Sequence, residues 1–178
     1  MRATSPLVSE RASTLREVYA GYAGYVWNTL RRLGAPDADL EDLTHDVFVQ
    51  VQRHLADYNG SRPMKPWLFC FAFRVLSTHR RGKRRRREGP NEPTDSIDPA
   101  PLADERLAAE QDRRLVIAAL GSIEPQRRAV FVLYALDDVP MDEIARTMSI
   151  PINTAYSRLR VAREEFRAAV TRLRRGVR

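Results

Sequence analysis

The segment MDEIARTMSIPINTAYSRLRVAR, Met141 to Arg163, decides the fold of the second half of this 178-residue chain. Ile144, Ala145 and Met148 form a small apolar face, which Ser-Ile-Pro at 149–151 interrupts. A second apolar face then resumes at spacings of three and four residues, at Ala155, Leu159 and Ala162. This spacing is typical of helices, and the interruption by proline is typical of a turn. We therefore expect two short helices joined by a tight turn.

The second of these helices carries polar side chains on its outer face: Asn153, Thr154, Tyr156, Ser157 and Arg160. Base edges and phosphates in a major groove require side chains that hydrogen-bond. The pattern therefore indicates a DNA-reading helix-turn-helix. A helical hairpin with a merely polar outer face would show the same local pattern, so the rest of the chain has to distinguish the two.

A net charge of +7 and a pI near 10.1 favour a polyanionic partner, because each phosphate neutralised by Lys or Arg releases counterions. An anionic membrane surface is the alternative. The longest apolar run, Trp67 to Phe73, is far shorter than the roughly 20 residues of a membrane-spanning helix. The N-terminus lacks the apolar segment of a signal peptide, and the single cysteine, Cys70, fits a reducing compartment. We expect a cytoplasmic protein without membrane insertion.

Composition divides the chain into two parts. Residues 88–112 contain eight acidic side chains, four prolines and one arginine. Such a segment buries too little apolar surface to offset its ordering entropy, so we expect a flexible, acidic, Pro-containing linker at 88–106. It joins predicted domains at 6–87 and 107–173. Both domains show helical spacing and neither shows a convincing strand pattern, so the predicted fold is all-α with two small helical domains.

Three helices are expected in the first domain. The first ends before Gly34, Asp39 can cap the second, and the third begins near Met64. The third helix runs into a basic segment, residues 80–87, with seven cations in eight residues. Nucleic acid is one explanation of this segment, and a solubilising charge run is the other. Aromatic and basic residues next to it favour nucleic acid: Tyr58, Asn59, Arg62, Lys65 and Trp67.

In the second domain, one helix should end at Gly121 and the next should have Pro125 in its first turn. The last helix is expected to extend to Leu173, followed by a basic C-terminus.

Enzymatic chemistry finds little support. The chain has no phosphate-binding glycine loop, no metal-ligand cluster among its three histidines and no nucleophile with an evident base partner. We expect no catalytic residues, no metal and no cofactor. Paired carboxylates are interpreted as solvated charges: Glu41-Asp42, Asp137-Asp138 and Glu164-Glu165.

Three blocks carry a resemblance to a known family. They are DLEDLTHDVFVQVQRHLADY, KPWLFCFAFRVLSTHRR and LGSIEPQRRAVFVLYALDDVPMDEIARTMSIPINTAYSRLRVAR. In this order they resemble regions 2.2, 2.3 to 2.4, and 4 of bacterial sigma factors of the extracytoplasmic-function (ECF) group, over about residues 12–173. The resemblance implies a protein without chemistry of its own, which binds core RNA polymerase and directs it to particular promoters.

The resemblance also implies roles for individual residues. Polymerase binding, to the clamp helices of the largest subunit, would fall to Asp42, His45, Asp46 and Phe48, although the family usually has Gln-Glu in place of His45-Asp46. The second domain would meet the flap region of the polymerase. Recognition of the −10 element would fall to the 57–63 loop and the third helix, with Tyr58, Asn59, Ser61, Lys65, Arg74, His79 and Arg80 as candidates.

The −35 element would be read by Asn153, Thr154, Tyr156, Ser157, Arg158 and Arg160. Of these, Arg158 and Arg160 are the strongest candidates, because guanidinium groups bind phosphate or guanine. Many members of the family are held inactive by an anti-sigma factor, which the resemblance adds as a candidate partner. The alternative is a conventional regulator that binds duplex DNA as a dimer without polymerase. The aromatic block at 57–80 suits single-stranded DNA better than dimerisation.

Overall fold

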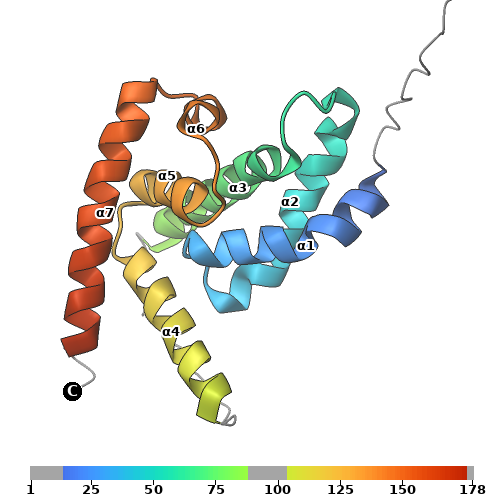
Figure 1. Ribbon diagram of the computed structural model, residues 1–178. Helices are drawn as coiled ribbons and strands as arrows, with labels where there is room; N and C mark the ends of the chain where they lie inside the picture. The colour runs from blue at the N-terminus through green and yellow to red at the C-terminus, as the bar shows by residue number, and fades with distance from the viewer. Residues whose placement is uncertain (1–13, 88–103, 176–178) are drawn as a thin grey trace, which may run out of the picture.

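The computed structural model describes residues 14–87 and 104–175, and every element within these ranges is a helix. The first half contains α1 (Leu15–Arg32), η1 (Asp37–Asp39), α2 (Leu40–His54), η2 (Leu55–Asp57) and α3 (Met64–Arg87). The second contains α4 (Asp104–Gly121), α5 (Pro125–Ala135), α6 (Met141–Met148) and α7 (Ile152–Arg175). Figure 1 shows α7 along one side of the molecule and α1 and α2 on the other, with α3 and α5 between them. The predicted all-α fold is confirmed.

Local sequence signals account for most helix ends. Thr14 and Glu17 form a capping box at the start of α1, with hydrogen bonds in both directions between side chain and backbone. The predicted ends at Met64, Gly121 and Pro125 are confirmed. The basic segment at 80–87 continues α3. Of the predicted linker, residues 88–103 lie outside the described residues, and 104–106 belong to α4.

Asp39 holds the N-cap position of α2, but its carboxylate makes no capping hydrogen bond. Instead it accepts from Lys83 Nζ at 2.6 Å and lies 3.1 Å from Nε2 of His79, both on α3. The carboxylate thus binds side chains of α3 and not the backbone N–H groups in the first turn of α2. Asp39 therefore ties α3 to the start of α2.

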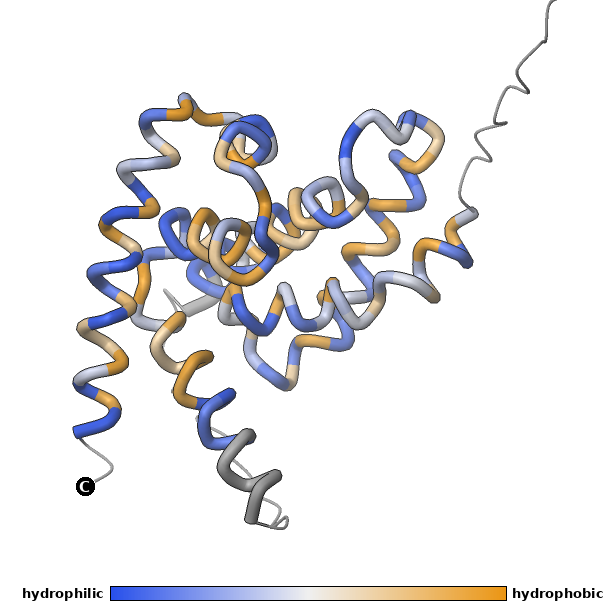
Figure 2. The backbone as a smooth tube through the Cα atoms, in the orientation of Figure 1, coloured by the Kyte–Doolittle hydropathy of each residue, from blue (hydrophilic) through white to orange (hydrophobic). Residues whose placement is uncertain are grey.

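Each half has its own apolar interior. In the first half, α1, α2 and α3 enclose fully buried side chains that include Leu30, Leu43, Val47, Leu68 and Phe69. In the second, the interior includes Leu120, Ile123, Leu133, Ile144 and Ala162. The two interiors belong to one continuous cluster of buried residues. Figure 2 shows the hydrophobic positions recurring along the helices, as an amphipathic pattern requires. None of the helices in the described part of the chain is long and apolar enough to span a membrane.

The halves also meet through buried polar groups. The interpretation of Asp137 as a solvated charge is wrong, because its side chain is only 3% exposed. Its carboxylate accepts hydrogen bonds from the hydroxyl of Tyr25 at 2.7 Å and from Arg32 Nη1 at 3.1 Å, both on α1. Elsewhere in the interface α3 packs on α6, and the Cys70 thiol donates to the carbonyl of Thr147 at 3.3 Å.

Candidate nucleic-acid interface

The predicted helix-turn-helix is present as α6 and α7. Ser149 ends α6 in the left-handed conformation, with φ of 52°, and its backbone N–H donates to carbonyls of the last turn of α6. This conformation is sterically costly for most residues, but it ends α6 and lets α7 begin after three residues. Ala145 and Ala155 are buried where the two helices meet. Small side chains there let α7 pack closely on α6, while Asn153 and Tyr156 in the first turns of α7 are exposed.

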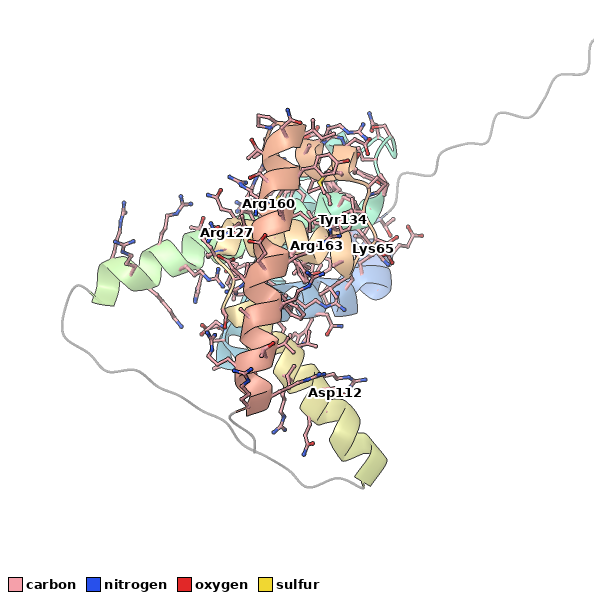
Figure 3. The ribbon with its side chains drawn as sticks, turned by 60° about the vertical axis from the view of Figure 1, so that its left-hand side comes forward. Lys65, Asp112, Arg127, Tyr134, Arg160 and Arg163 are labelled. Carbon is pink, nitrogen blue, oxygen red and sulfur yellow. The ribbon has the colours of Figure 1, made fainter. Side chains whose placement is uncertain are left out.

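Most of the predicted −35 residues lie on the accessible side of α7. Asn153, Tyr156, Ser157 and Arg160 are exposed, whereas Thr154 and Arg158 are partly buried. Arg158 donates to the side-chain oxygen of Gln126, and Arg160 Nη1 lies 2.8 Å from Glu164 Oε1. Both members of the Arg160 pair are more than 60% exposed, so the pair contributes little and can be exchanged for a phosphate or base. Figure 3 shows Arg160 and Arg163 projecting from α7.

The second candidate surface is the loop before α3. Tyr58, Trp67 and Phe71 form a continuous aromatic cluster, with successive ring centroids 4.8 Å apart. The Tyr58 hydroxyl donates to the carbonyl of Arg62, and the backbone N–H of Ser61 donates to Asn59 Oδ1 at 3.1 Å. These contacts hold the loop around a hollow of about 280 Å³ lined also by Asp57 and Trp67. Trp67 is half-buried and supports the loop from within.

The other predicted −10 residues are distributed along α3. Lys65 and Arg74 are exposed, whereas His79 and Arg80 are half-buried. His79 contacts Asp39, and Arg80 Nη2 donates to the carbonyls of Leu33 and Gly34 at the end of α1. Burial lowers the pKa of Arg80, and the hydrogen bond from Lys83 is the main cause that lowers the pKa of Asp39. The structure thus brings the loop and Lys65 together and turns His79 and Arg80 toward the α1–α2 connection.

The predicted polymerase-binding residues lie on α2. Asp42, His45 and Asp46 are exposed, but Phe48 is buried, with its ring 4.7 Å from that of Tyr19 on α1. Tyr19 and Trp27 are 52% and 39% exposed and border a cleft of about 460 Å³ beside His45. Sequence reasoning missed this cleft, because Tyr19 fits the apolar period of α1. The position of Trp27 immediately after the buried Val26, off that stripe, is the signal that was available.

No three His, Cys, Asp or Glu side chains are gathered so as to hold a metal ion anywhere in residues 14–87 and 104–175. Burial raises the pKa of the half-buried Cys70 thiol, which suppresses the reactive thiolate. The side chains exposed on the candidate surfaces are hydrogen-bonding groups, cations, aromatic rings and, on α2, the carboxylates of Asp42 and Asp46.

Both halves of the chain match known protein families. Residues 18–86 match the sigma-70 region 2 family, and residues 113–166 match the sigma-70 region 4 family. The ECF RNA polymerase sigma factor SigE of Mycolicibacterium smegmatis is 30% identical over 158 residues, which span 85% of this chain and 59% of that relative. This chain is an ECF sigma factor. We accordingly call its halves region 2 (α1 to α3) and region 4 (α4 to α7).

A relative of similar length supports the same family membership. The ECF sigma factor SigL of Mycobacterium tuberculosis is 26% identical over 175 residues, 97% of this sigma factor and 98% of that relative. Among solved structures, the sigma factor RpoE of Bartonella quintana, crystallised with the anti-sigma factor NepR, superposes with a TM-score of 0.69. It is 17% identical, and the match covers 88% of this chain and 96% of that one. The fold of both regions is therefore shared with solved sigma factors.

Proposed function

We propose that this protein binds core RNA polymerase and directs promoter-specific initiation of transcription. The observation that carries the proposal is the presence of two different DNA-facing surfaces on one chain. Region 4 presents a projecting helix of the size that enters a major groove. Region 2 presents a preformed loop and hollow backed by an aromatic cluster, a kind of surface that suits unstacked bases.

At the −35 element, α7 would lie in the major groove of duplex DNA. Arg158 and Arg160 would bind phosphate or guanine, and Asn153, Thr154, Tyr156 and Ser157 would contribute shorter hydrogen bonds. Before Arg158 contacts DNA, it has to leave Gln126, whereas Arg160 has to leave only an exposed carboxylate. Arg160 is therefore the better placed of the two.

At the −10 element, region 2 would hold the separated strand. A base that leaves the stack loses a few kcal/mol, which a shaped pocket has to return. The hollow at Tyr58, Asn59 and Ser61 is a candidate for that pocket, and Lys65 and Arg74 would contact the backbone of the strand. His79 and Arg80 would take part only after release from their present partners.

Polymerase docking is assigned to the exposed face of α2. Asp42, His45 and Asp46 would contact the clamp helices of the largest subunit. Phe48, buried against Tyr19, would support this face by packing α2 on α1. Region 4 would meet the flap region. The solved relative bound to an anti-sigma factor supports a regulatory partner of that kind. In this role the protein is a non-enzymatic subunit without a cofactor, and it acts in the cytoplasm.

The test is transcription in vitro with purified bacterial core RNA polymerase on a pool of genomic fragments. We expect initiation at discrete sites only when this protein is added, with shared −35 and −10 sequences upstream of those sites. A parallel reaction with core polymerase and its housekeeping sigma factor shows that the enzyme is active. Specific DNA binding without any gain in initiation would overturn the proposal and indicate a conventional regulator.

A further inference from the structure

Two large apolar side chains are exposed in the first turns of α7. Ile152 is 44% exposed and Tyr156 is 55% exposed, and at a spacing of four residues they are neighbours on one face of the helix. Ile150, two residues before α7, packs instead on the buried core. Apolar surface left in water is unfavourable, and a partner that covers it recovers free energy. The pair therefore indicates a partner with apolar groups of its own.

Asn153 lies beside this pair and offers an amide. The amide of Asn28 donates to the carbonyl of Gly24 at 2.8 Å, and that of Asn59 accepts from the backbone N–H of Ser61 at 3.1 Å. The Asn153 side chain, by contrast, is exposed and makes no hydrogen bond within residues 14–87 and 104–175. Its amide carries one donor group and one acceptor. In the major groove adenine presents the matching edge, with N7 as acceptor and N6 as donor.

The rest of this helix face favours DNA over a protein as the partner. Arg160 follows Tyr156 after another four residues, so the apolar pair continues into a guanidinium group. The first turn of α7 contains no acidic side chain that would repel a phosphate. Asn153 and Arg160 are about 10 Å apart along the helix, whereas bases stack about 3.4 Å apart. The two side chains would therefore reach different base pairs.

We propose that the first turns of α7 read A·T base pairs in the −35 element, with Asn153 on an adenine and Ile152 packed on a thymine methyl group. Asparagine pairs with N6 and N7 of adenine, and thymine is the base whose major-groove edge carries a methyl group. Tyr156, beside Ile152, completes the apolar contact. G·C pairs would leave Ile152 against polar edges and the amide mismatched. This inference rests on the proposed function of α7 at the −35 element and adds the bases that it recognises.

The experiment removes single groups from the DNA. Full-length protein first selects duplexes from a random pool. Each thymidine of the selected element is then replaced by deoxyuridine, which lacks only the methyl group, and each adenine by its 7-deaza analogue, which lacks N7. Fluorescence anisotropy measures the affinities of wild type, Ile152→Ala and Asn153→Ala. Leu136→Ala is the matched control, because Leu136 is 37% exposed in a hollow that α1 and α4 line. The changes in the DNA test wild type directly, whether or not the variants fold.

We expect deoxyuridine at one position to weaken wild-type binding about fourfold, the effect of one buried apolar carbon group. The 7-deaza analogue at one adenine, and Asn153→Ala, should each weaken it about tenfold. The deoxyuridine effect should disappear in Ile152→Ala and persist in Leu136→Ala.

Three results would overturn the inference. They are a selected element without A·T pairs, wild-type affinity that is insensitive to the methyl group or to N7, and an equal deoxyuridine effect in wild type and Ile152→Ala. Selection of no sequence at all would instead overturn the proposed role of α7 at the −35 element. None of these readouts requires polymerase, so failure of the transcription function remains distinguishable.

Discussion

The two DNA-facing surfaces of this sigma factor differ in how far they are prepared for DNA. On α7, Tyr156 is 55% exposed, and Arg160 is held only by an exposed glutamate. In region 2, by contrast, Arg80 is bonded to the end of α1 and Lys65 faces a carboxylate-lined cleft. We therefore expect recognition of duplex DNA by α7 to need little rearrangement, and any contact of Arg80 with a separated strand to need release of its hydrogen bonds to the end of α1.

The largest expected effect concerns Arg128, a buried residue of region 4 that contacts region 2. Arg128→Ala leaves the carbonyls of Leu33, Gly121 and Ile123 without their donor, so it should lower the free energy of unfolding by about 3 kcal/mol. Burial already lowers the pKa of Arg128 to about 10, which reflects its desolvation. Urea denaturation measures the loss.

Arg127→Ala is the matched control, because this neighbour forms a half-exposed ion pair with Glu165 within region 4. We expect it to cost at most about 1 kcal/mol. Equal losses for the two variants would show that the buried contact does not hold the regions together.

The second effect concerns the binding of duplex DNA by α7. Arg160→Ala should weaken binding to −35 duplex by about tenfold to a hundredfold, since one bidentate contact to guanine contributes about 1–3 kcal/mol. Binding of −10 single strands should not change. Fluorescence anisotropy on both DNAs measures the difference. Arg167→Ala, seven residues further along the same helix, is the control. An equal loss of affinity in that variant would show that Arg160 contributes only its positive charge and not a specific contact.

A smaller effect separates polymerase docking from both DNA surfaces. Asp46→Arg reverses an exposed charge on α2 and should weaken core polymerase binding by about tenfold, with duplex affinity unchanged. Titration of labelled sigma factor with core polymerase measures it. Asp37→Arg makes the same charge change at an exposed turn, and we expect it to bind normally. Normal polymerase binding by Asp46→Arg would contradict the assignment of polymerase docking to α2.

The smallest effect is a pH dependence within region 2. Lys83 and His79 lower the pKa of Asp39 below its ordinary value of 3.8. The carboxylate therefore stabilises the fold above that value, and this stabilisation is lost as the pH falls through the lowered pKa. Asp39→Asn should cost at most about 1 kcal/mol at pH 7.

Urea denaturation at pH values from 7 to below 3.8 should show the difference in unfolding free energy between wild type and Asp39→Asn narrowing once the pH falls below 3.8, the ordinary pKa of the carboxyl group. A gap that stays constant over this range would contradict the assignment of the ion pairs. Asp37→Asn, at a more exposed position in the same turn, should show a smaller gap at pH 7.

Features set by neighbouring residues could be predicted from the sequence. The starts of α3 and α5 at Met64 and Pro125, and the turn before α7, follow from local apolar spacing and from glycine and proline positions. The exposed polar face of α7 follows from the same period. The individual site residues remain predictions, because contact with DNA or polymerase depends on a partner outside the chain.

Features set by distant residues could not be predicted. The partners of Asp137 lie 112 and 105 positions earlier, and the carbonyl bound by Arg128 lies 95 positions earlier. Nothing near Asp137 in the sequence distinguishes it from Asp138, which is exposed. The contacts of Asp39 with α3 could not be predicted for the same reason, because its partners lie 40 and 44 positions later. Burial of charge depends on how the regions pack, and periodicity within one helix carries no signal of that.

The most direct test of the two-surface account measures opening of the −10 element itself. A promoter found by the transcription experiment would carry 2-aminopurine in that element, whose fluorescence rises when the base leaves the stack. We predict a rise with this sigma factor and core polymerase together, and none with either alone. The rise should be lost for Arg160→Ala at limiting protein. Binding of −35 duplex without any rise, in the presence of core polymerase that is active with its housekeeping sigma factor, would contradict the account.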